Sequence, residues 1–299
     1  CRMKTVLFTG SAVALVTPMH QDGSVDFSAL KFLIERQIEQ HTDAIVVCGT
    51  TGEASTLTVK EHLKVIEAAV DTVNGRIPVL AGTGSNDTAH AVEMSKQAVS
   101  LGADGLLLVT PYYNKTNALG LVRHFFSIAD AAQVPCIVYN VPTRTGMKIR
   151  PETYQKLSEH PFIVGAKEAS GNFSDIAETA CLCKDALTLY CGNDEQTLPM
   201  LSLGAKGVIS VLANIVPYQV HLLCKAFFDG DLALSRNLQL QYVPLIQALF
   251  CDVNPMPVKA AMNMMHLPAG ECRLPLAGIS EQEKARVAQA LQGLSLLSA

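Results

Sequence analysis

Along the chain, eight short apolar runs alternate with segments in which apolar residues recur every three or four positions. Each run is rich in aliphatic residues and is bounded by Gly, Pro or Asn, which is typical of a buried β-strand. The runs are residues 11–18, 43–50, 77–83, 104–111, 135–141, 162–167, 187–193 and 206–211. The spacing in the intervening segments predicts amphipathic helices, which are clearest at residues 26–40, 58–73 and 87–102.

This alternation predicts a (β/α)8 barrel, the α/β fold known as the TIM barrel. Near-continuous apolar strands, unlike strictly alternating ones, are typical of a parallel sheet that is covered on both faces. Eight strand–helix units within about 210 residues fit a closed barrel better than an open doubly wound sheet. We therefore predict a catalytic barrel over residues 5–216 and a C-terminal helical region over residues 217–299 that is helical throughout.

The composition indicates a soluble globular protein and argues against nucleic-acid and membrane partners. Of the 299 residues, 49% are hydrophobic and 17% are charged. No uninterrupted apolar run reaches the length of about eighteen residues that a membrane span requires. The net charge is −4, and the Lys and Arg residues are scattered, so the chain provides no basic surface for a phosphate backbone.

The cysteines favour a reducing, cytoplasmic compartment. There are nine, an odd number, and the first residues do not match an export signal followed by a cleavage site. Cys181 and Cys183 lie two residues apart in a predicted helix and so point to different faces, which makes them unsuitable as a pair of metal ligands. Because Met3 follows them, we expect Cys1 and Arg2 to be a remnant of cloning.

The sixth predicted strand ends in Lys167, and the chemistry of a barrel lies at the carboxyl ends of its strands. A lysine in a mostly apolar mouth loses hydration of its ammonium group, which lowers its pKa toward the range where free amine exists. Only the free amine attacks a carbonyl carbon, so this position favours Schiff-base chemistry. The alternative is a surface lysine that ends the strand and pairs with Glu168.

Three hydroxyl groups fall at other strand ends. Tyr139 lies at the end of the fifth predicted strand, Thr50 at the end of the second, and Tyr113 just after the fourth. Formation of an imine requires proton transfers to and from a carbinol oxygen, and a phenol can donate and accept these protons. A lone tyrosine at a strand end is more often a packing residue. The hypothesis of a proton relay therefore depends on the three hydroxyls facing Lys167 together.

Two further features suit carboxylates. The segment GTTGE at residues 49–53 supplies backbone N–H groups that could bind a carboxylate or a phosphate. Arg144, in the turn PTRTG, could hold a second carboxylate bidentately, or it could be an exposed loop residue. Neither GTTGE nor GTGSN at residues 82–86 matches a nucleotide-binding glycine motif. We predict no metal site, because no pair at metal-ligand spacing beside a carboxylate occurs among His20, His62, His90 and His124.

These motifs resemble those of the dihydrodipicolinate synthase family, in the superfamily of pyruvate-dependent class I aldolases and N-acetylneuraminate lyases. The resemblance spans residues 5–293 and includes GTTGEASTLTVKEH, TPYYNK, YNVPTRTG, VGAKEASGN and GVISV, in the family's order and spacing. It implies condensation of pyruvate with L-aspartate 4-semialdehyde to 4-hydroxy-tetrahydrodipicolinate, on the diaminopimelate route to lysine. It also implies a covalent imine with pyruvate and no cofactor.

The resemblance assigns a role to eight residues. The catalytic residues would be Lys167, Tyr139, Thr50 and Tyr113, and the substrate-binding residues would be Thr51, Arg144, Gly192 and Ile209. Lys167 would form the imine and the three hydroxyls would relay protons, with Tyr113 reaching into a neighbouring subunit. Thr51 would hold the carboxylate of pyruvate and Arg144 that of the semialdehyde, while Gly192 and Ile209 would line the pocket. The implied assembly is a homotetramer built from two tight dimers.

Two alternatives remain open. Relatives with the same lysine and tyrosine cleave N-acetylneuraminate or sugar-acid aldols to pyruvate. Those lyases usually carry Ser-Thr where this chain has GTTGE, and they lack the arginine that matches Arg144. A catalytically silent binding relative is the other alternative. The intact set of Lys167, Tyr139, Thr50, Tyr113 and Arg144 argues against it.

A possible lysine effector site follows from the same resemblance. The matching residues are Ala54, Ser55, His62, Asn86 and Tyr112. Val59 and His90, however, stand where lysine-sensitive members often carry a histidine and a glutamate. Loss of that carboxylate removes the natural partner of a bound lysine's ammonium group. We therefore expect weak or absent feedback by lysine.

Overall fold

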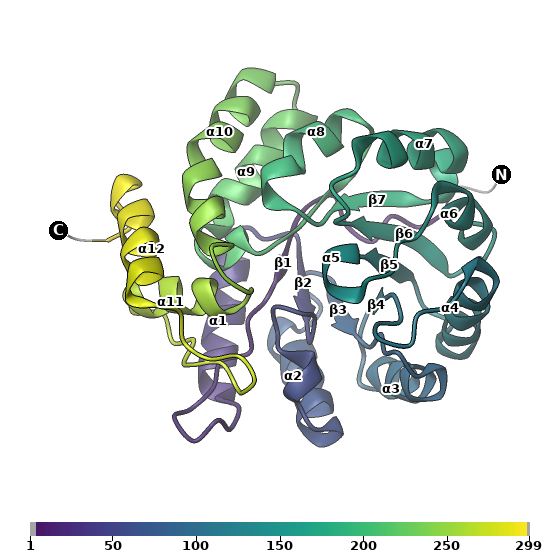
Figure 1. The fold of residues 1–299 in the computed structure, drawn as a ribbon, viewed down its shortest axis with the longest axis horizontal. Coiled ribbons are helices and arrows are strands. Elements are labelled where there is room, and N and C mark those ends of the chain that lie inside the picture. Colours follow the sequence, from purple (N-terminus) through teal and green to yellow (C-terminus); the bar gives the residue numbers. More distant parts are fainter. Residues whose placement is uncertain (1–3, 298–299) are drawn as a thin grey trace.

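Eight parallel strands form a closed barrel in the computed structural model, which describes residues 4–297 (Figure 1). The strands are β1 Gly10–Ala14, β2 Ala44–Val47, β3 Val79–Gly82, β4 Gly105–Val109, β5 Cys136–Asn140, β6 Ile163–Glu168, β7 Thr188–Cys191 and β8 Gly207–Ser210. Each strand pairs with the next in the chain, and β1 closes the barrel against β8. Every strand overlaps a predicted run, so the predicted barrel is confirmed. The expected cloning remnant, Cys1 and Arg2, lies outside the described residues.

Helices surround the barrel and fill the connections between strands (Figure 1). They are α1 Phe27–Glu39, α2 Val59–Val73, α3 Thr88–Ser100, α4 Ala118–Ala132, α5 Pro142–Thr145, α6 Pro151–Leu157, α7 Phe173–Cys183, α8 Thr197–Ser202, α9 Pro217–Phe228, α10 Leu232–Leu249, α11 Met256–Met264 and α12 Glu281–Gly293. The first three begin where the sequence predicts, because Asp26, Thr58 and Asp87 each accept a hydrogen bond from a backbone N–H of the first turn. Within residues 4–297, every helix is too short or too polar to cross a membrane.

Side chains fill the barrel interior at the end where the strands begin. Phe8, which precedes β1, stacks on Tyr190 of β7 with ring centroids 4.3 Å apart. The Tyr190 hydroxyl also donates a hydrogen bond to the Phe8 carbonyl at 2.9 Å. Small and aliphatic side chains complete this inner core, which is separate from the larger core between the barrel and its helices. The interior is packed here, so a ligand can reach it only from the carboxyl ends of the strands.

The prediction that residues 217–299 are helical throughout is wrong. Between residues 217 and 297 the structure has four helices, α9 to α12, but residues 265–280 between α11 and α12 form an extended loop. The sequence of this loop explains the break, since Pro268 and Pro275 lack a backbone donor and Gly270 adopts a positive φ of 67°. The loop returns to the mouth of the barrel, where Pro275 and Leu276 reach the cavity described below.

Candidate active site

Lys167 and Tyr139 lie side by side inside the barrel mouth. They are directly paired residues on the neighbouring strands β6 and β5, so their side chains project to the same face. The Lys167 Nζ lies 4.3 Å from the centroid of the Tyr139 ring, and Lys167 is only 5% exposed. The structure therefore places the lysine in the desolvated position that the sequence predicts.

Glu168 does not pair with Lys167. As the next residue along β6 it projects to the opposite face, where its carboxylate accepts hydrogen bonds from the Tyr154 hydroxyl at 2.8 Å and the Asn140 side chain at 3.0 Å. No ion pair between residues 4 and 297 includes Lys167. The alternative of a surface lysine that pairs with Glu168 is therefore wrong.

Burial lowers the pKa of the Lys167 ammonium from 10.5 to about 8, because the charged form loses its hydration. The positive charge of Arg144 lowers it further, while negative charge on Asp194 and Cys191 acts in the opposite direction. At pH 7 a lysine with a pKa of about 8 is roughly one-tenth unprotonated, whereas an unperturbed lysine is below about 0.1%. The site therefore supplies a nucleophilic amine near neutral pH.

Gly192 lies beside this lysine and Ile209 packs in the inner core, so their expected role in lining the substrate pocket stays a prediction. Ile209 of β8 is fully buried in the inner core that contains Tyr139. Gly192 follows β7, and a Cβ at this position would lie 2.8 Å from the Ala169 Cβ and 3.2 Å from the Lys167 Cε. A side chain here would press against the lysine, so glycine keeps the space beside Lys167 open.

Tyr139 connects the lysine to a cavity at the barrel mouth. The cavity has a volume of about 440 Å³, and Thr50, Tyr139 and Arg144 lie in its wall. Burial raises the pKa of the Tyr139 phenol to about 12, although the charge of Arg144 and a hydrogen bond with Thr50 partly offset this effect. The phenol is therefore protonated at neutral pH and can donate its proton. Lys167 lies behind Tyr139 rather than in the cavity wall.

Asn254, which the sequence analysis missed, links two of the expected substrate-binding residues. Its side-chain amide donates a hydrogen bond to the Thr51 hydroxyl at 2.9 Å, and its backbone carbonyl accepts one from the Arg144 guanidinium at 3.1 Å. Thr51 itself is buried beside this amide. Asn254 lies between α10 and α11, far from both partners in the sequence, and only its neighbour Pro255 signals a break between helices there.

Asp194, which follows β7, is a second functional candidate that the sequence analysis did not name. Its buried Oδ2 accepts hydrogen bonds from the backbone N–H groups of Val211 and Leu212, both at 2.9 Å. Burial raises the pKa of this carboxyl group. When ionised, it contributes the largest effect that favours the charged form of Lys167.

Tyr113 is the one expected catalytic residue whose side chain is almost fully exposed. It is 94% exposed and its backbone has a φ of 68°, a left-handed conformation that is uncommon for a bulky residue. Within a single chain its phenol does not reach the other three catalytic candidates.

Most of the expected effector residues lie in the same cavity as Thr50 and Tyr139. Ala54, Ser55, His62 and Tyr112 are in its wall, together with Val59 and His90, whereas Asn86 is not. The His62 Nε2 lies 2.8 Å from the Gly82 carbonyl, and burial lowers the pKa of the ring. A neutral His62 thus donates to that carbonyl, and the cavity is continuous from Arg144 to His90.

No group of three His, Cys, Asp or Glu side chains within residues 4–297 is arranged to hold a metal ion. The absence of a metal and of a cofactor stays a prediction. Among the cysteines, burial raises the pKa of Cys136 and Cys272 to about 12, which leaves these thiols protonated and unreactive.

Comparison with known proteins gives one consistent result. The chain matches the model of the dihydrodipicolinate synthetase family over residues 7–294. It is 53% identical to the 4-hydroxy-tetrahydrodipicolinate synthase of Caldicellulosiruptor bescii, over 95% of this chain and 96% of that protein.

Two crystal structures of dihydrodipicolinate synthases superpose on this chain with a TM-score of 0.95 each. One is the Acinetobacter baumannii enzyme in complex with pyruvate, with 43% identity and 97% and 99% coverage. The other is the Cyanidioschyzon merolae enzyme with lysine bound, with 39% identity and 98% and 100% coverage. This chain belongs to the dihydrodipicolinate synthetase family.

Proposed function

We propose that this enzyme is a 4-hydroxy-tetrahydrodipicolinate synthase, which condenses pyruvate with L-aspartate 4-semialdehyde through an imine on Lys167. The observation that carries the proposal is the desolvated Lys167 against Tyr139, with Arg144 in the wall of the adjoining cavity. Relatives of the same name are about half identical to this chain over nearly its whole length.

The reaction begins when the free amine of Lys167 attacks the ketone carbon of pyruvate. The carbinolamine loses water to form the imine, and loss of a methyl proton gives an enamine. The enamine carbon then attacks the aldehyde of the second substrate. The amino group of that substrate displaces Lys167 from the imine carbon, which closes the ring and frees the lysine. One water molecule is released overall.

Proton transfer in these steps is assigned to Tyr139, Thr50 and Tyr113. The Tyr139 ring lies against the Lys167 ammonium, and Tyr139 shares the cavity wall with Thr50, so its phenol is proposed to protonate the departing carbinol oxygen. Tyr113 is exposed in its own chain and is proposed to enter the site of a neighbouring subunit.

The two substrate carboxylates are assigned to different groups. Arg144 faces the cavity and has the planar geometry that binds a carboxylate bidentately, so it is proposed to hold the semialdehyde. Thr51 and the backbone N–H groups of residues 49–51 are proposed to hold pyruvate, since those of Gly52 and Glu53 already donate hydrogen bonds within the turn. The hydrogen bond from Asn254 to the Thr51 hydroxyl leaves that hydroxyl's own proton free to donate.

A comparison of two substrates tests the assignment. Pyruvate consumption with L-aspartate 4-semialdehyde would be measured beside pyruvate release from N-acetylneuraminate. Turnover is expected only in the first assay, because Arg144 suits a second small carboxylate. Activity in the second assay, or in neither, would contradict the proposed substrate pair.

The lowered pKa of Lys167 predicts the pH dependence of imine formation. The amine must be unprotonated to react, so kcat/KM for pyruvate should rise about tenfold per pH unit below its pKa and level off above it. With the Lys167 pKa at about 8, the plateau should begin near that pH. A rise that continues toward pH 10.5, the ordinary pKa of lysine, would contradict the inferred desolvation.

We also expect lysine to inhibit this enzyme weakly or not at all. Ser55, His62 and Tyr112 line a cavity that could admit an amino acid, but His90 provides no carboxylate for the ammonium group of lysine. Steady-state rates should therefore change little in millimolar lysine, and His90→Glu should increase inhibition. Rates that halve at submillimolar lysine in the wild-type enzyme would contradict this expectation.

A cytoplasmic homotetramer of two tight dimers is proposed as the working form. The support is the exposure and left-handed backbone of Tyr113, which a neighbouring subunit would bury and hold in place. Sedimentation velocity of the purified enzyme would test the assembly, and a monomer with full activity would contradict it. Fractionation of cells that produce the enzyme would test the compartment.

A further inference from the structure

The carboxylate of Glu53 lies behind the turn that carries Thr50 and Thr51. Glu53 ends the segment GTTGE, its side chain is fully buried, and its backbone has a left-handed φ of 55°. Its N–H donates a hydrogen bond to the Thr50 carbonyl at 3.1 Å, so the turn is tight. A movement of Glu53 would therefore displace Thr50, which lies with Tyr139 in the wall of the cavity.

Both oxygens of this carboxylate are bound by the C-terminal region. The Nζ of Lys259 in α11 lies 2.5 Å from the Glu53 Oε1, and Lys259 is itself only 2% exposed. The backbone N–H of Arg273 donates a hydrogen bond to the Oε2 at 2.9 Å. Lys259 also donates to the Glu271 carbonyl at 3.0 Å. Its ammonium group thus joins the turn to the loop between α11 and α12.

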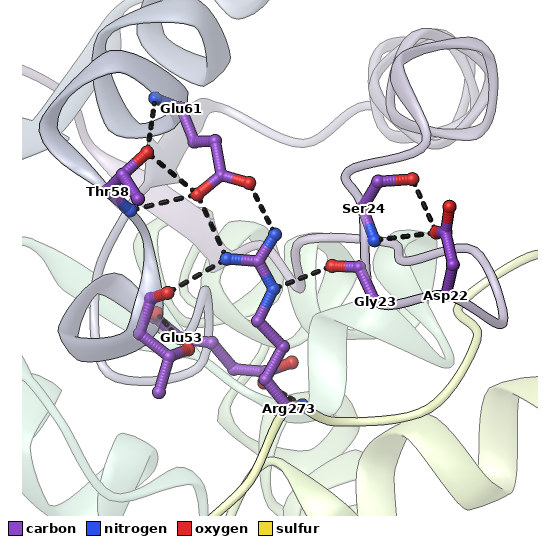
Figure 2. Close-up of polar contacts among 8 residues, drawn as sticks. Asp22, Gly23, Ser24, Glu53, Thr58, Glu61 and Arg273 are labelled. Carbon is purple, nitrogen blue, oxygen red and sulfur yellow. Dashed lines mark hydrogen bonds and ion pairs between the residues drawn. The ribbon is translucent and has the colours of Figure 1, made fainter.

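The Arg273 side chain extends this connection beyond the turn (Figure 2). Its guanidinium donates hydrogen bonds to the carbonyls of Gly23 at 2.6 Å and Thr56 at 2.8 Å. It also binds both carboxylate oxygens of Glu61, at 2.5 Å and 3.0 Å. The loop is therefore bound to the 3-10 turn Ala54–Thr56 and to the start of α2 as well as to Glu53.

Stability alone does not account for a buried ion pair at this place. Desolvation of two charges offsets most of their attraction, and a well-packed hydrophobic pair is often as stable. The ion pair instead orients Glu53, because the Lys259 ammonium holds one carboxylate oxygen and a hydrogen bond from the Arg273 N–H holds the other. Orientation matters here, since a displacement of about 1 Å at an active site can lower the rate about 10²-fold.

We propose that Glu53 and Lys259 are positioning residues, through which the C-terminal region holds Thr50 and Thr51 in their catalytic geometry. They act through the turn and not on the reacting atoms. The inference rests on the proposed function, because its effect is measured on the reaction with pyruvate.

Two variants separate positioning from stability. Lys259→Met leaves the buried Glu53 carboxylate unpaired and should lower the thermal midpoint. The double variant Glu53→Met, Lys259→Met removes both charges and keeps side chains of similar length, so it should recover much of that stability. The matched control is Glu35→Gln, which breaks the exposed ion pair of Glu35 with Arg76, 2.8 Å long, on the outside of the barrel.

The measurements are the thermal midpoint, the rate at which borohydride traps the pyruvate imine, and kcat/KM for pyruvate across the pH range around 8. In the folded double variant, the plateau of kcat/KM should fall about fivefold or more, while the rise near pH 8 stays in place because the surroundings of Lys167 are unchanged. Glu35→Gln should match the wild type.

Other outcomes are equally informative. A smaller fall in the double variant, a recovery of kcat/KM together with stability, or a shifted pH rise would each overturn the positioning role. A wild-type enzyme that traps no pyruvate would instead contradict the proposed function, whatever the variants do.

Discussion

Lys167→Ala should abolish trapping of pyruvate by borohydride and lower turnover by about 10³-fold or more, as expected for loss of a nucleophile. Mass spectrometry of the reduced protein measures the first effect directly, because the wild type gains the mass of a reduced pyruvate adduct. Lys206→Ala is a suitable control, since Lys206 is an exposed lysine just before β8. Undiminished trapping in the Lys167→Ala variant would show that a different lysine forms the imine.

The same substitution should leave stability nearly unchanged. A lysine whose pKa falls from 10.5 to about 8 on folding destabilises the folded state by about 3 kcal/mol at pH 7, because the unfolded chain binds its proton more tightly. This penalty is complete below pH 8 and disappears above pH 10.5. Alanine removes the penalty but also loses about 2 kcal/mol of packing by three methylene groups. A thermal midpoint within a few degrees of wild type would separate lost chemistry from lost folding.

Local patterns in the sequence were sufficient to predict the barrel and its central pair. Eight apolar runs bounded by Gly, Pro or Asn became eight strands, because each run is short and buried on both faces. In such a barrel consecutive strands are neighbours, so the ends of the fifth and sixth runs had to meet. Tyr139 and Lys167 are indeed paired across β5 and β6.

Contacts between distant parts of the chain could not be predicted in this way. Asn254 contacts Thr51 and Arg144, and Lys259 contacts Glu53. These partners lie more than 100 residues apart in the sequence, whereas hydrophobic periodicity reports only on neighbouring residues. The predicted continuous helix after residue 217 also concealed the loop that carries Arg273. Hydrophobic spacing identifies which segments are buried, but the partner of a buried charge depends on how remote segments pack.

The orientation of Tyr113 shows a second limit. Its place after β4 predicts a position near the barrel mouth, which is correct, but its side chain extends into solvent. A strand end fixes where a backbone lies, whereas the direction of a side chain in the following loop depends on that loop's φ and ψ angles. For Tyr113, the direction of the side chain decides whether its phenol can enter the active site of its own chain or that of a neighbouring subunit.

Tyr139→Phe should slow turnover by about 10²-fold or more, the usual scale for loss of a positioned proton donor. Phenylalanine keeps the ring that packs against the Lys167 ammonium at 4.3 Å, so the lysine should stay desolvated. The rise of kcat/KM with pH should therefore remain near 8, where the Lys167 amine loses its proton. Only the height of the plateau should fall, because the phenol that protonates the carbinol oxygen is gone.

Tyr190→Phe is the matched control for this experiment. Tyr190 is also buried inside the barrel and is the register partner of Lys167 on the other side, in β7. Its hydroxyl donates to the Phe8 carbonyl at 2.9 Å and so faces away from the cavity. Loss of that hydrogen bond should cost about 1 kcal/mol of stability and leave turnover within about twofold of wild type. If both phenylalanine variants slow the reaction equally, the defect lies in barrel packing and Tyr139 is not the proton donor.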